Sequence, residues 1–223
     1  MNIWTITILV MVASFIIQNM LNSRFNKYSQ VRTPNGMTGA EVAQRMLDEN
    51  GIRDVRISCI PGQLTDHYNP ETRTVNLSES VYSQRSIAAA AVAAHECGHV
   101  IQHHCGYAPL KMRSALVPVV SFSSKAVQWV LLLGVLVITV TPALLWLGIA
   151  LFAMTTLFSL ITLPVEINAS QRAVKWLRSS NIVNYETAPM AADALKWAAY
   201  TYVIAAIGSL ATLFYYIGIA RRN

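Results

Sequence analysis

The stretch SIAAAAVAAHECGHVIQHH at residues 86–104 decides how the rest of the chain is interpreted. Its first half is rich in alanine, which has the highest helix propensity, so the stretch predicts one long, largely buried helix. His95 and His99 are four residues apart, which places both imidazoles on one helix face, about 6 Å apart along the axis. One helix therefore offers two nitrogen ligands to a single metal ion.

Glu96 has the position of a catalytic base in this stretch. It is rotated about 100° from His95 on the same turn, so it lies beside the metal, where it can deprotonate a zinc-bound water. This is the HExxH pattern of zinc metalloproteases, in which Gly98 leaves room beside the site. We expect one catalytic Zn²⁺ bound by His95 and His99, with Glu96 as the base. Cys97 lies on the far side of the helix and is expected to be a packing residue.

A catalytic zinc site needs a third protein ligand and keeps one position open for water. His103 lies about 12 Å from His95 along the helix axis, with His99 between them, so these three side chains cannot form a tetrahedron. We expect His103 and His104 to support the site from outside or to lie on the surface. Glu166 is the better candidate, because an acidic residue so close to an apolar span normally has a function. The sequence leaves open four weaker alternatives: Glu186, Asp193, Asp66 and His67.

The composition is that of a membrane protein. Of the 223 residues, 54% are hydrophobic and 13% are charged, whereas soluble domains have about 25% charged residues. Residues 3–21, 126–165 and 197–220 carry no charge. The middle segment is interrupted at residues 139–142 and is long enough for two spans of about 20 residues, so four spans are predicted. The first is expected to be an uncleaved signal anchor, because no basic region precedes it and no small-residue cleavage site follows it.

Basic residues at the ends of the spans indicate the orientation. Most lie beside the polar segments 23–113 and 164–196, which the positive-inside rule places in the cytoplasm, with both termini outside. Only Arg221 and Arg222 depart from this pattern. The three cysteines make no even set, which favours reduced thiols. The net charge of +6 is scattered along the chain, so no nucleic-acid partner is expected.

Local patterns predict a small folded domain between the spans. A capping box predicts a helix at residues 38–50, and alternating apolar residues predict a strand at 55–59. Residues 64–68 and 73–77 are expected to form a hairpin. The predicted fold class is α+β: a mostly α-helical multipass membrane protein with four spans and a small catalytic domain that carries a β-hairpin.

The predicted organisation has five segments. They are a transmembrane anchor (1–22), a catalytic domain with the HExxH helix (23–113), a transmembrane hairpin (114–163), a second part of the catalytic domain with the third zinc ligand (164–196), and a C-terminal transmembrane helix (197–223).

Several separate blocks of the chain resemble one known family. The blocks are LTDHYNP at 64–70, SIAAAAVAAHE at 86–96, AAHECGHVIQH at 93–103, LPVEINASQRA at 163–173 and ALKWAAYTYVIAA at 194–206. They are similar to the YugP-type neutral zinc metallopeptidases of bacterial membranes, over nearly the whole chain. The resemblance implies an integral-membrane protein with a zincin-like catalytic domain. It also implies His95, His99 and Glu166 as zinc ligands and Glu96 as the catalytic base.

The chain departs from the wider group at one position. Membrane peptidases of comparable layout resemble the pattern E-x-x-A-D after the hairpin, whereas here Ser170 follows Glu166 at the place of the Asp. A hydroxyl accepts an imidazole N–H more weakly than a carboxylate does, so the support of the zinc ligands is expected to differ. Asp193 and Asn168 are alternatives for that support, and the sequence does not decide between them.

These observations predict a membrane-embedded zinc metalloendopeptidase of the bacterial plasma membrane, with its site on the cytoplasmic side. Its partners would be the lipid bilayer and a peptide or membrane-protein substrate; the sequence predicts no oligomeric state. Two other functions are compatible with parts of the pattern. One is a non-proteolytic membrane scaffold that binds zinc, which the intact Glu96 argues against. The other is a small transporter, which would need ionisable residues within the spans.

An extended substrate is expected to pair with the edge of a strand before the motif helix, and residues 73–77 are the predicted strand. Zinc peptidases also need a donor to the oxyanion of the transition state. Tyr82, His67 and Tyr200 are equal candidates for that donor.

Overall fold

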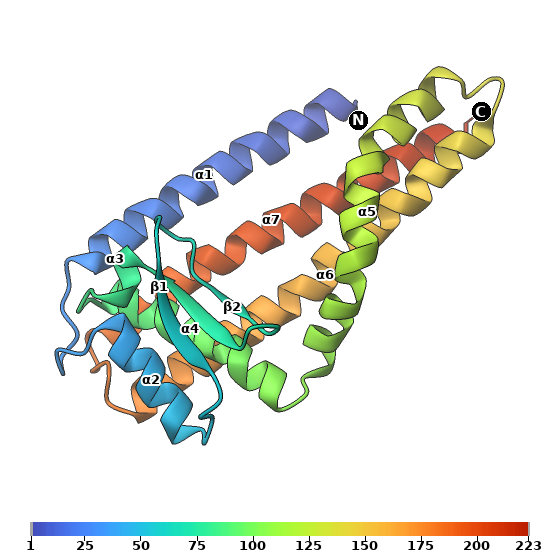
Figure 1. Ribbon diagram of the computed structural model, residues 1–223. Coiled ribbons are helices and arrows are strands. Elements are labelled where there is room, and N and C mark those ends of the chain that lie inside the picture. The colour runs from blue at the N-terminus through green and yellow to red at the C-terminus, as the bar shows by residue number, and fades with distance from the viewer. Residues whose placement is uncertain (1, 223) are drawn as a thin grey trace. The chain divides into compact units, whose positions relative to one another are not determined.

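The computed structural model describes residues 2–222, and within them the chain forms seven helices and one three-stranded sheet (Figure 1). The elements are α1 (Ile3–Ser29), α2 (Gly39–Glu49), β1 (Arg56–Ile60), β2 (His67–Asn69), β3 (Thr74–Ser78), α3 (Glu79–Tyr82), α4 (Ile87–His104), α5 (Ala108–Leu136), α6 (Pro142–Ser179) and α7 (Ala188–Ala220). Helices α1, α5, α6 and α7 are long and apolar enough to cross a membrane. The predicted α+β fold of a multipass membrane protein is confirmed.

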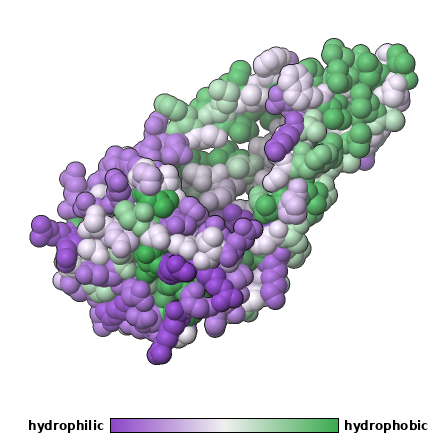
Figure 2. All heavy atoms as spheres, viewed as in Figure 1, coloured by the Kyte–Doolittle hydropathy of each residue, from purple (hydrophilic) through white to green (hydrophobic). Residues whose placement is uncertain are grey.

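The chain divides into two compact units. One, the polar unit, comprises residues 17–107 and 165–200; the other, the apolar unit, comprises residues 1–16, 108–164 and 201–223. Figure 2 shows hydrophilic residues gathered over the sheet and the short helices of the polar unit, and hydrophobic residues over the helices of the apolar unit. Where the five predicted segments enter and leave the bilayer stays a prediction.

Small residues set the packing of the apolar unit. A Cβ on Gly134 of α5 would lie 2.7 Å from the main chain of Leu145 in α6. A Cβ on Gly148 of α6 would lie 2.8 Å from the side chain of Leu131 in α5 and 3.2 Å from its main-chain nitrogen. Such close contacts are typical of membrane helices, which associate by van der Waals packing because lipid is as apolar as their side chains. The chain turns between α5 and α6 at residues 137–141, where the sequence predicted an interruption.

The polar segment 164–196, which follows the predicted transmembrane hairpin, is not built as expected. Its first half is no separate insert but continues α6 as one helix of 38 residues that ends at Ser179. Pro164 lies inside this helix without ending it. Consequently Glu166 lies on the same helix as the apolar run before it.

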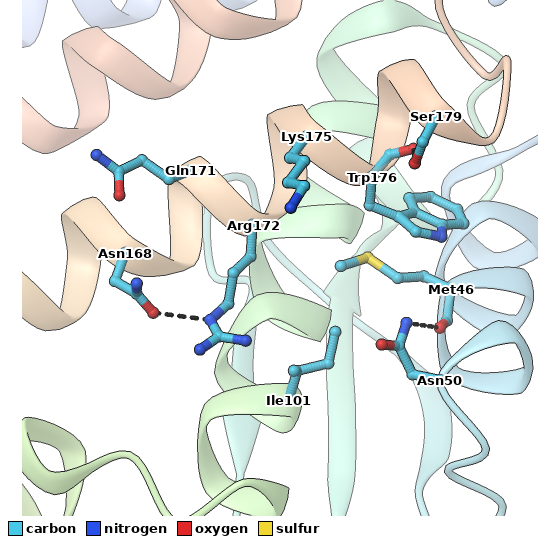
Figure 3. Close-up of a pocket in the computed structure, with 9 residues that line it drawn as sticks. All are labelled: Met46, Asn50, Ile101, Asn168, Gln171, Arg172, Lys175, Trp176 and Ser179. Carbon is cyan, nitrogen blue, oxygen red and sulfur yellow. Dashed lines mark hydrogen bonds between the residues drawn. The ribbon is translucent and has the colours of Figure 1, made fainter.

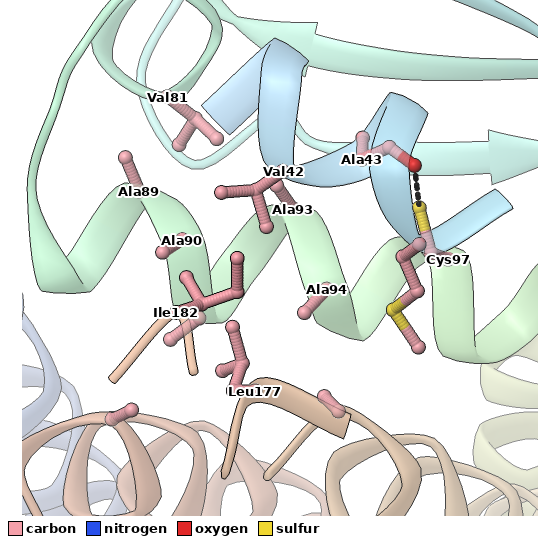
Figure 4. Close-up of a cluster of buried hydrophobic side chains, with 14 of the residues drawn as sticks. Val42, Ala43, Val81, Ala89, Ala90, Ala93, Ala94, Cys97, Leu177 and Ile182 are labelled. Atoms are coloured by element: carbon pink, nitrogen blue, oxygen red, sulfur yellow. Dashed lines mark hydrogen bonds between the residues drawn. The ribbon is translucent and has the colours of Figure 1, made fainter. Parts of the chain in front are cut away.

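Helix α4 forms the centre of the polar unit. The Ser86 Oγ accepts the Ala89 N–H at 3.2 Å and begins the helix, where the sequence predicted its start. The alanines of α4 are buried and leave room for α2, whose Val42 packs against them, and for Leu177 of α6 (Figure 4). Cys97 belongs to this core: its thiol is 3.6 Å from the carbonyl oxygen of Ala43. Burial raises the pKa of the Cys97 thiol, which keeps it protonated, as expected of a packing residue.

The sheet has the strand order β1-β3-β2, with β1 parallel and β2 antiparallel to β3. The predicted hairpin is confirmed, and so is the capping box, since Thr38 and Glu41 make both of its hydrogen bonds. The prediction that residues 73–77 form an edge strand is wrong. Because β1 pairs with one side of β3 and β2 with the other, β3 is the central strand. The edge strands are β1 and β2.

Helices α4 and α6 approach each other closely at Gly98. A Cβ at this position would lie 2.7 Å from the carbonyl oxygen of Ala169 and 3.1 Å from its Cα. Two helix backbones can approach this closely only where one presents no side chain. The contact fixes which residues of α6 face the HExxH stretch.

We predict that Gly98→Ala destabilises the protein although alanine is the better helix former. The added methyl group has to push the Ala169 backbone away, and overpacking of this kind typically costs about 1–3 kcal/mol. Thermal unfolding in detergent measures the effect. Gly218→Ala is the matched control, because a Cβ there meets nothing within 4 Å. Equal stability of the two variants would contradict the close packing of α4 on α6.

Candidate metal centre

Three predicted ligands meet between α4 and α6. The His95 Nε2 lies 3.2 Å and the His99 Nε2 3.5 Å from Oε2 of Glu166. The ligand atoms of all three side chains lie within 4.8 Å of one another. Glu166 is 3% exposed, so its carboxylate is buried against the two imidazoles. Among residues 2–222 this is the one group of three or more His, Cys, Asp or Glu side chains with such spacing.

The distances from the two imidazole nitrogens to the carboxylate oxygen fit a zinc ion. Tetrahedral zinc with bonds of about 2.0–2.1 Å holds neighbouring ligand atoms roughly 3.3 Å apart. The two imidazole-to-carboxylate distances lie close to that value. Two imidazole nitrogens and one carboxylate oxygen are also a common ligand set of catalytic zinc, which leaves a fourth position for water or substrate. The residues at this position therefore suit the metal.

The opposite ring nitrogens of both histidines have partners that orient them. The Nδ1 of His95 lies 3.1 Å from the Ser170 hydroxyl, and the Nδ1 of His99 lies 3.0 Å from Oε1 of Gln102. The Gln102 amide nitrogen donates to the Val165 carbonyl oxygen at 2.8 Å, which leaves Oε1 as the acceptor. His99 therefore carries its proton on Nδ1 and keeps the Nε2 lone pair for a metal.

Gln102 is the supporting residue that the sequence reasoning missed. It is fully buried and lies three residues after His99, on the same side of α4. This spacing of three residues is the one feature of the sequence that could have pointed to Gln102 as a partner of His99. Ser170 does contact a histidine, as the aligned pattern suggested, and Asn168 accepts a hydrogen bond from Gln102 at 3.0 Å. Asp193 instead accepts the Tyr28 hydroxyl at 2.7 Å.

The electrostatics around His99 favour a cation. Burial lowers the pKa of His99, but the hydrogen bond to Glu166 and the charges of Glu96 and Glu166 outweigh it, so the pKa is raised. The same two carboxylates that favour a proton on His99 favour a divalent cation in its place.

Glu96 lies beside these ligands and is held by the sheet. Its Oε2 accepts the main-chain N–H of Tyr68 in β2 at 3.1 Å, and the residue is 7% exposed. Its other oxygen has no hydrogen-bond partner among the described residues, so this oxygen can accept a proton from a water molecule. The Tyr68 ring packs on His103, whose Nδ1 lies 3.3 Å from the Tyr68 hydroxyl.

The other residues considered from the sequence lie apart from the three ligands or have other contacts. Asp66 accepts the N–H and hydroxyl of Ser78, both ring nitrogens of His67 contact neighbours within the hairpin segment, and Glu186 and His104 are exposed. For the oxyanion donor, the Tyr200 ring packs against Trp197 and Lys196, and no described contact brings Tyr82 or His67 to Glu96.

Comparison with known proteins gives the chain its family. The family model described as "Putative neutral zinc metallopeptidase" matches residues 3–221. The chain is similar to the "Putative membrane protease YugP" of Bacillus subtilis (strain 168), with 44% identity over 212 residues that cover 95% of this chain and 93% of that protein. No solved structure matches. The resemblance seen in the sequence is therefore confirmed, and the chain belongs to the family described as putative neutral zinc metallopeptidases.

Proposed function

We propose that this membrane protein is a zinc metalloendopeptidase with Glu96 as its catalytic base and His95, His99 and Glu166 as its zinc ligands. One observation carries the proposal: a buried carboxylate from α6 lies 3.2 and 3.5 Å from two imidazole nitrogens of α4, and a second carboxylate, Glu96, is close enough to raise the pKa of His99. A structural zinc site has no use for that second carboxylate, because its coordination is closed.

A zinc ion bound by the three ligands would polarise the scissile carbonyl and lower the pKa of the attacking water. The protein's own groups supply the rest. Glu96 takes the proton of the water and delivers it to the leaving nitrogen. The Tyr68 N–H fixes the orientation of the carboxylate during both transfers. The hydrogen bonds to Ser170 and Gln102 hold the imidazoles in one tautomer and rotamer.

The edge of β2 is the surface along which an extended peptide would bind. One side of β2 pairs with β3, and the Tyr68 N–H on the other side points to Glu96. A peptide that pairs with the remaining main-chain groups of this edge passes the catalytic base. This replaces the role first assigned to residues 73–77. With three residues, β2 offers few main-chain hydrogen bonds, so side-chain contacts have to supply most of the selectivity.

The substrates we propose are membrane proteins or their cytoplasmic segments. Glu166 follows the apolar run of α6 directly, so on our reading the site lies at the membrane surface on the cytoplasmic side. A peptide bond close to the bilayer reaches such a site without leaving the membrane. The partners are therefore the bilayer and a peptide substrate.

Glu96→Gln should abolish peptide cleavage while zinc stays bound. The amide cannot accept the proton, and loss of a general base typically lowers kcat by about 10²–10⁴-fold. Comparative proteomics of cells with wild type or variant measures cleavage, and metal analysis of the purified proteins measures zinc. Glu186→Gln changes an exposed carboxylate and should leave both unchanged. Identical cleavage products from wild type and Glu96→Gln would refute the peptidase.

Glu166→Ala should lower the zinc affinity by more than about 100-fold, because it removes a direct ligand rather than a supporting group. Competition with a chromophoric chelator measures the affinity. Asp193→Asn is the matched control, since Asp193 contacts Tyr28 and Arg24 instead of the histidines. Unchanged affinity in Glu166→Ala would show that the third ligand lies elsewhere.

The cytoplasmic placement predicts which thiols a membrane-impermeant maleimide reaches. Cys59 and Cys105 are exposed, and both lie in the polar unit with the candidate site. In intact cells neither should react, and both should react after permeabilisation, while the buried Cys97 stays protected. A reporter fused after the last residue should in turn be detected outside the cytoplasm. Labelling of Cys59 in intact cells is the result that would reverse the orientation.

A further inference from the structure

A groove lies in the polar unit, between α6, the end of α2 and α4 (Figure 3). Its volume is about 530 Å³, within the range of roughly 300–1,000 Å³ that is usual for ligand sites. The floor is apolar and includes Met46, Ile101 and the Trp176 ring. None of the three proposed zinc ligands lines it.

The groove is cationic. Arg172 and Lys175 line it from α6, three residues apart and therefore on one side of the helix. Arg172 uses Nε for a hydrogen bond to Asn168, and its Nη2 reaches only the Cys105 sulfur at 3.9 Å, which leaves most of the guanidinium fork for a ligand. Lys175 has no recorded partner among residues 2–222. Both are the side chains that proteins use to bind phosphate.

No acidic side chain lines the groove within the described part of the chain. The carboxylate of Glu49 contacts Trp176 at one end of the groove. Its charge is balanced by the ion pair with Arg45, whose Nε donates to it at 2.8 Å, and its other oxygen accepts from Trp176 Nε1 at 2.8 Å and Ser180 Oγ at 2.6 Å. The charge that an incoming anion meets is therefore that of Arg172 and Lys175.

The position along α6 indicates the source of the anion. Arg172 and Lys175 follow Val165, where the apolar run of the helix ends, by seven and ten residues. At about 1.5 Å per residue they lie roughly 10–15 Å beyond it along the axis, next to the headgroup layer of a bilayer. This step rests on the membrane placement in the proposed function. Basic pockets beside membrane helices at this depth suit anionic lipid headgroups.

A chain of hydrogen bonds joins the groove to the candidate metal centre. Arg172 Nε donates to Asn168 Oδ1 at 2.8 Å, and the same oxygen accepts from Gln102 Nε2 at 3.0 Å. Gln102 in turn contacts His99. A ligand that holds the Arg172 guanidinium therefore acts on the group that orients a zinc ligand. By linkage, the metal and the groove ligand must then influence each other's affinity equally.

We propose that this groove binds the phosphate of an acidic phospholipid headgroup and that the bound headgroup stabilises zinc at His99. The phosphate accepts from Arg172 and Lys175, while the apolar floor contacts the adjoining glycerol. The bilayer itself would thus keep the enzyme loaded with metal.

The binding test uses the full chain in nanodiscs of zwitterionic lipid, with increasing fractions of phosphatidylglycerol and native mass spectrometry as readout. The double variant Arg172→Gln/Lys175→Gln should bind the acidic lipid about 10- to 30-fold more weakly, as expected for two lost charges near the surface. The control Arg53→Gln/Arg178→Gln loses the same charge at exposed positions outside the groove and should bind like wild type. Equal losses in both double variants would overturn the site. So would displacement of the lipid by inorganic phosphate at the same phosphate concentration, which would assign the groove to a soluble anion.

The coupling test measures the rate at which a chelator removes zinc. The acidic lipid should slow removal at least fivefold in wild type and have no effect in Arg172→Gln/Lys175→Gln. Gln102→Leu changes a side chain outside the groove and should bind the lipid like wild type, but the lipid should no longer slow zinc removal, because the chain from Asn168 to His99 is cut. Protection that persists in Gln102→Leu would overturn the coupling. The lipid-binding readout requires neither zinc nor cleavage, so failure of the proposed peptidase and failure of the groove are distinguishable.

Discussion

The candidate site depends on one contact, the approach of the α6 backbone to α4 at Gly98. Helix α4 alone presents His95, His99 and Glu96, and this much follows from the spacing along one helix. The third proposed ligand, Glu166, lies on another helix and reaches the imidazoles only because Gly98 has no side chain. The candidate site therefore forms only when α4 and α6 pack against each other in the polar unit. Metal binding should in turn stabilise that packing, since energy gained at such a site is also folding energy.

The partners of the two histidines add no charge to the site. Two carboxylates, Glu96 and Glu166, are buried there, and together they match the charge of one Zn²⁺. The Ser170 hydroxyl and the Gln102 amide fix the imidazole rings without adding charge. They also leave the imidazoles less basic than carboxylate partners would. The affinity for the metal then depends more on other groups that hold the ligands in place.

Much of this arrangement could be predicted from the sequence, and the parts that could not share a cause. The motif helix, the capping box and the apolar spans depend on neighbours within a few residues, and Glu166 was marked by its charge at the end of an apolar run. The order of the strands and the role of Gln102 depend on partners distant in the chain. Nothing local in residues 73–77 tells that β1 pairs with their other side. Likewise Gln102 is polar and buried only because Val165 and Asn168 of α6 receive its hydrogen bonds.

X-ray absorption at the zinc edge of the purified protein tests the central claim most directly. The account predicts one zinc per chain, with two imidazole rings and the remaining ligands oxygen at about 2.0–2.1 Å. Cys97, although it lies within the motif, should contribute no sulfur, because its thiol is buried against Ala43 on the other side of α4. A sulfur ligand at about 2.3 Å, or a shell with a single imidazole, would contradict the assignment of His95, His99 and Glu166.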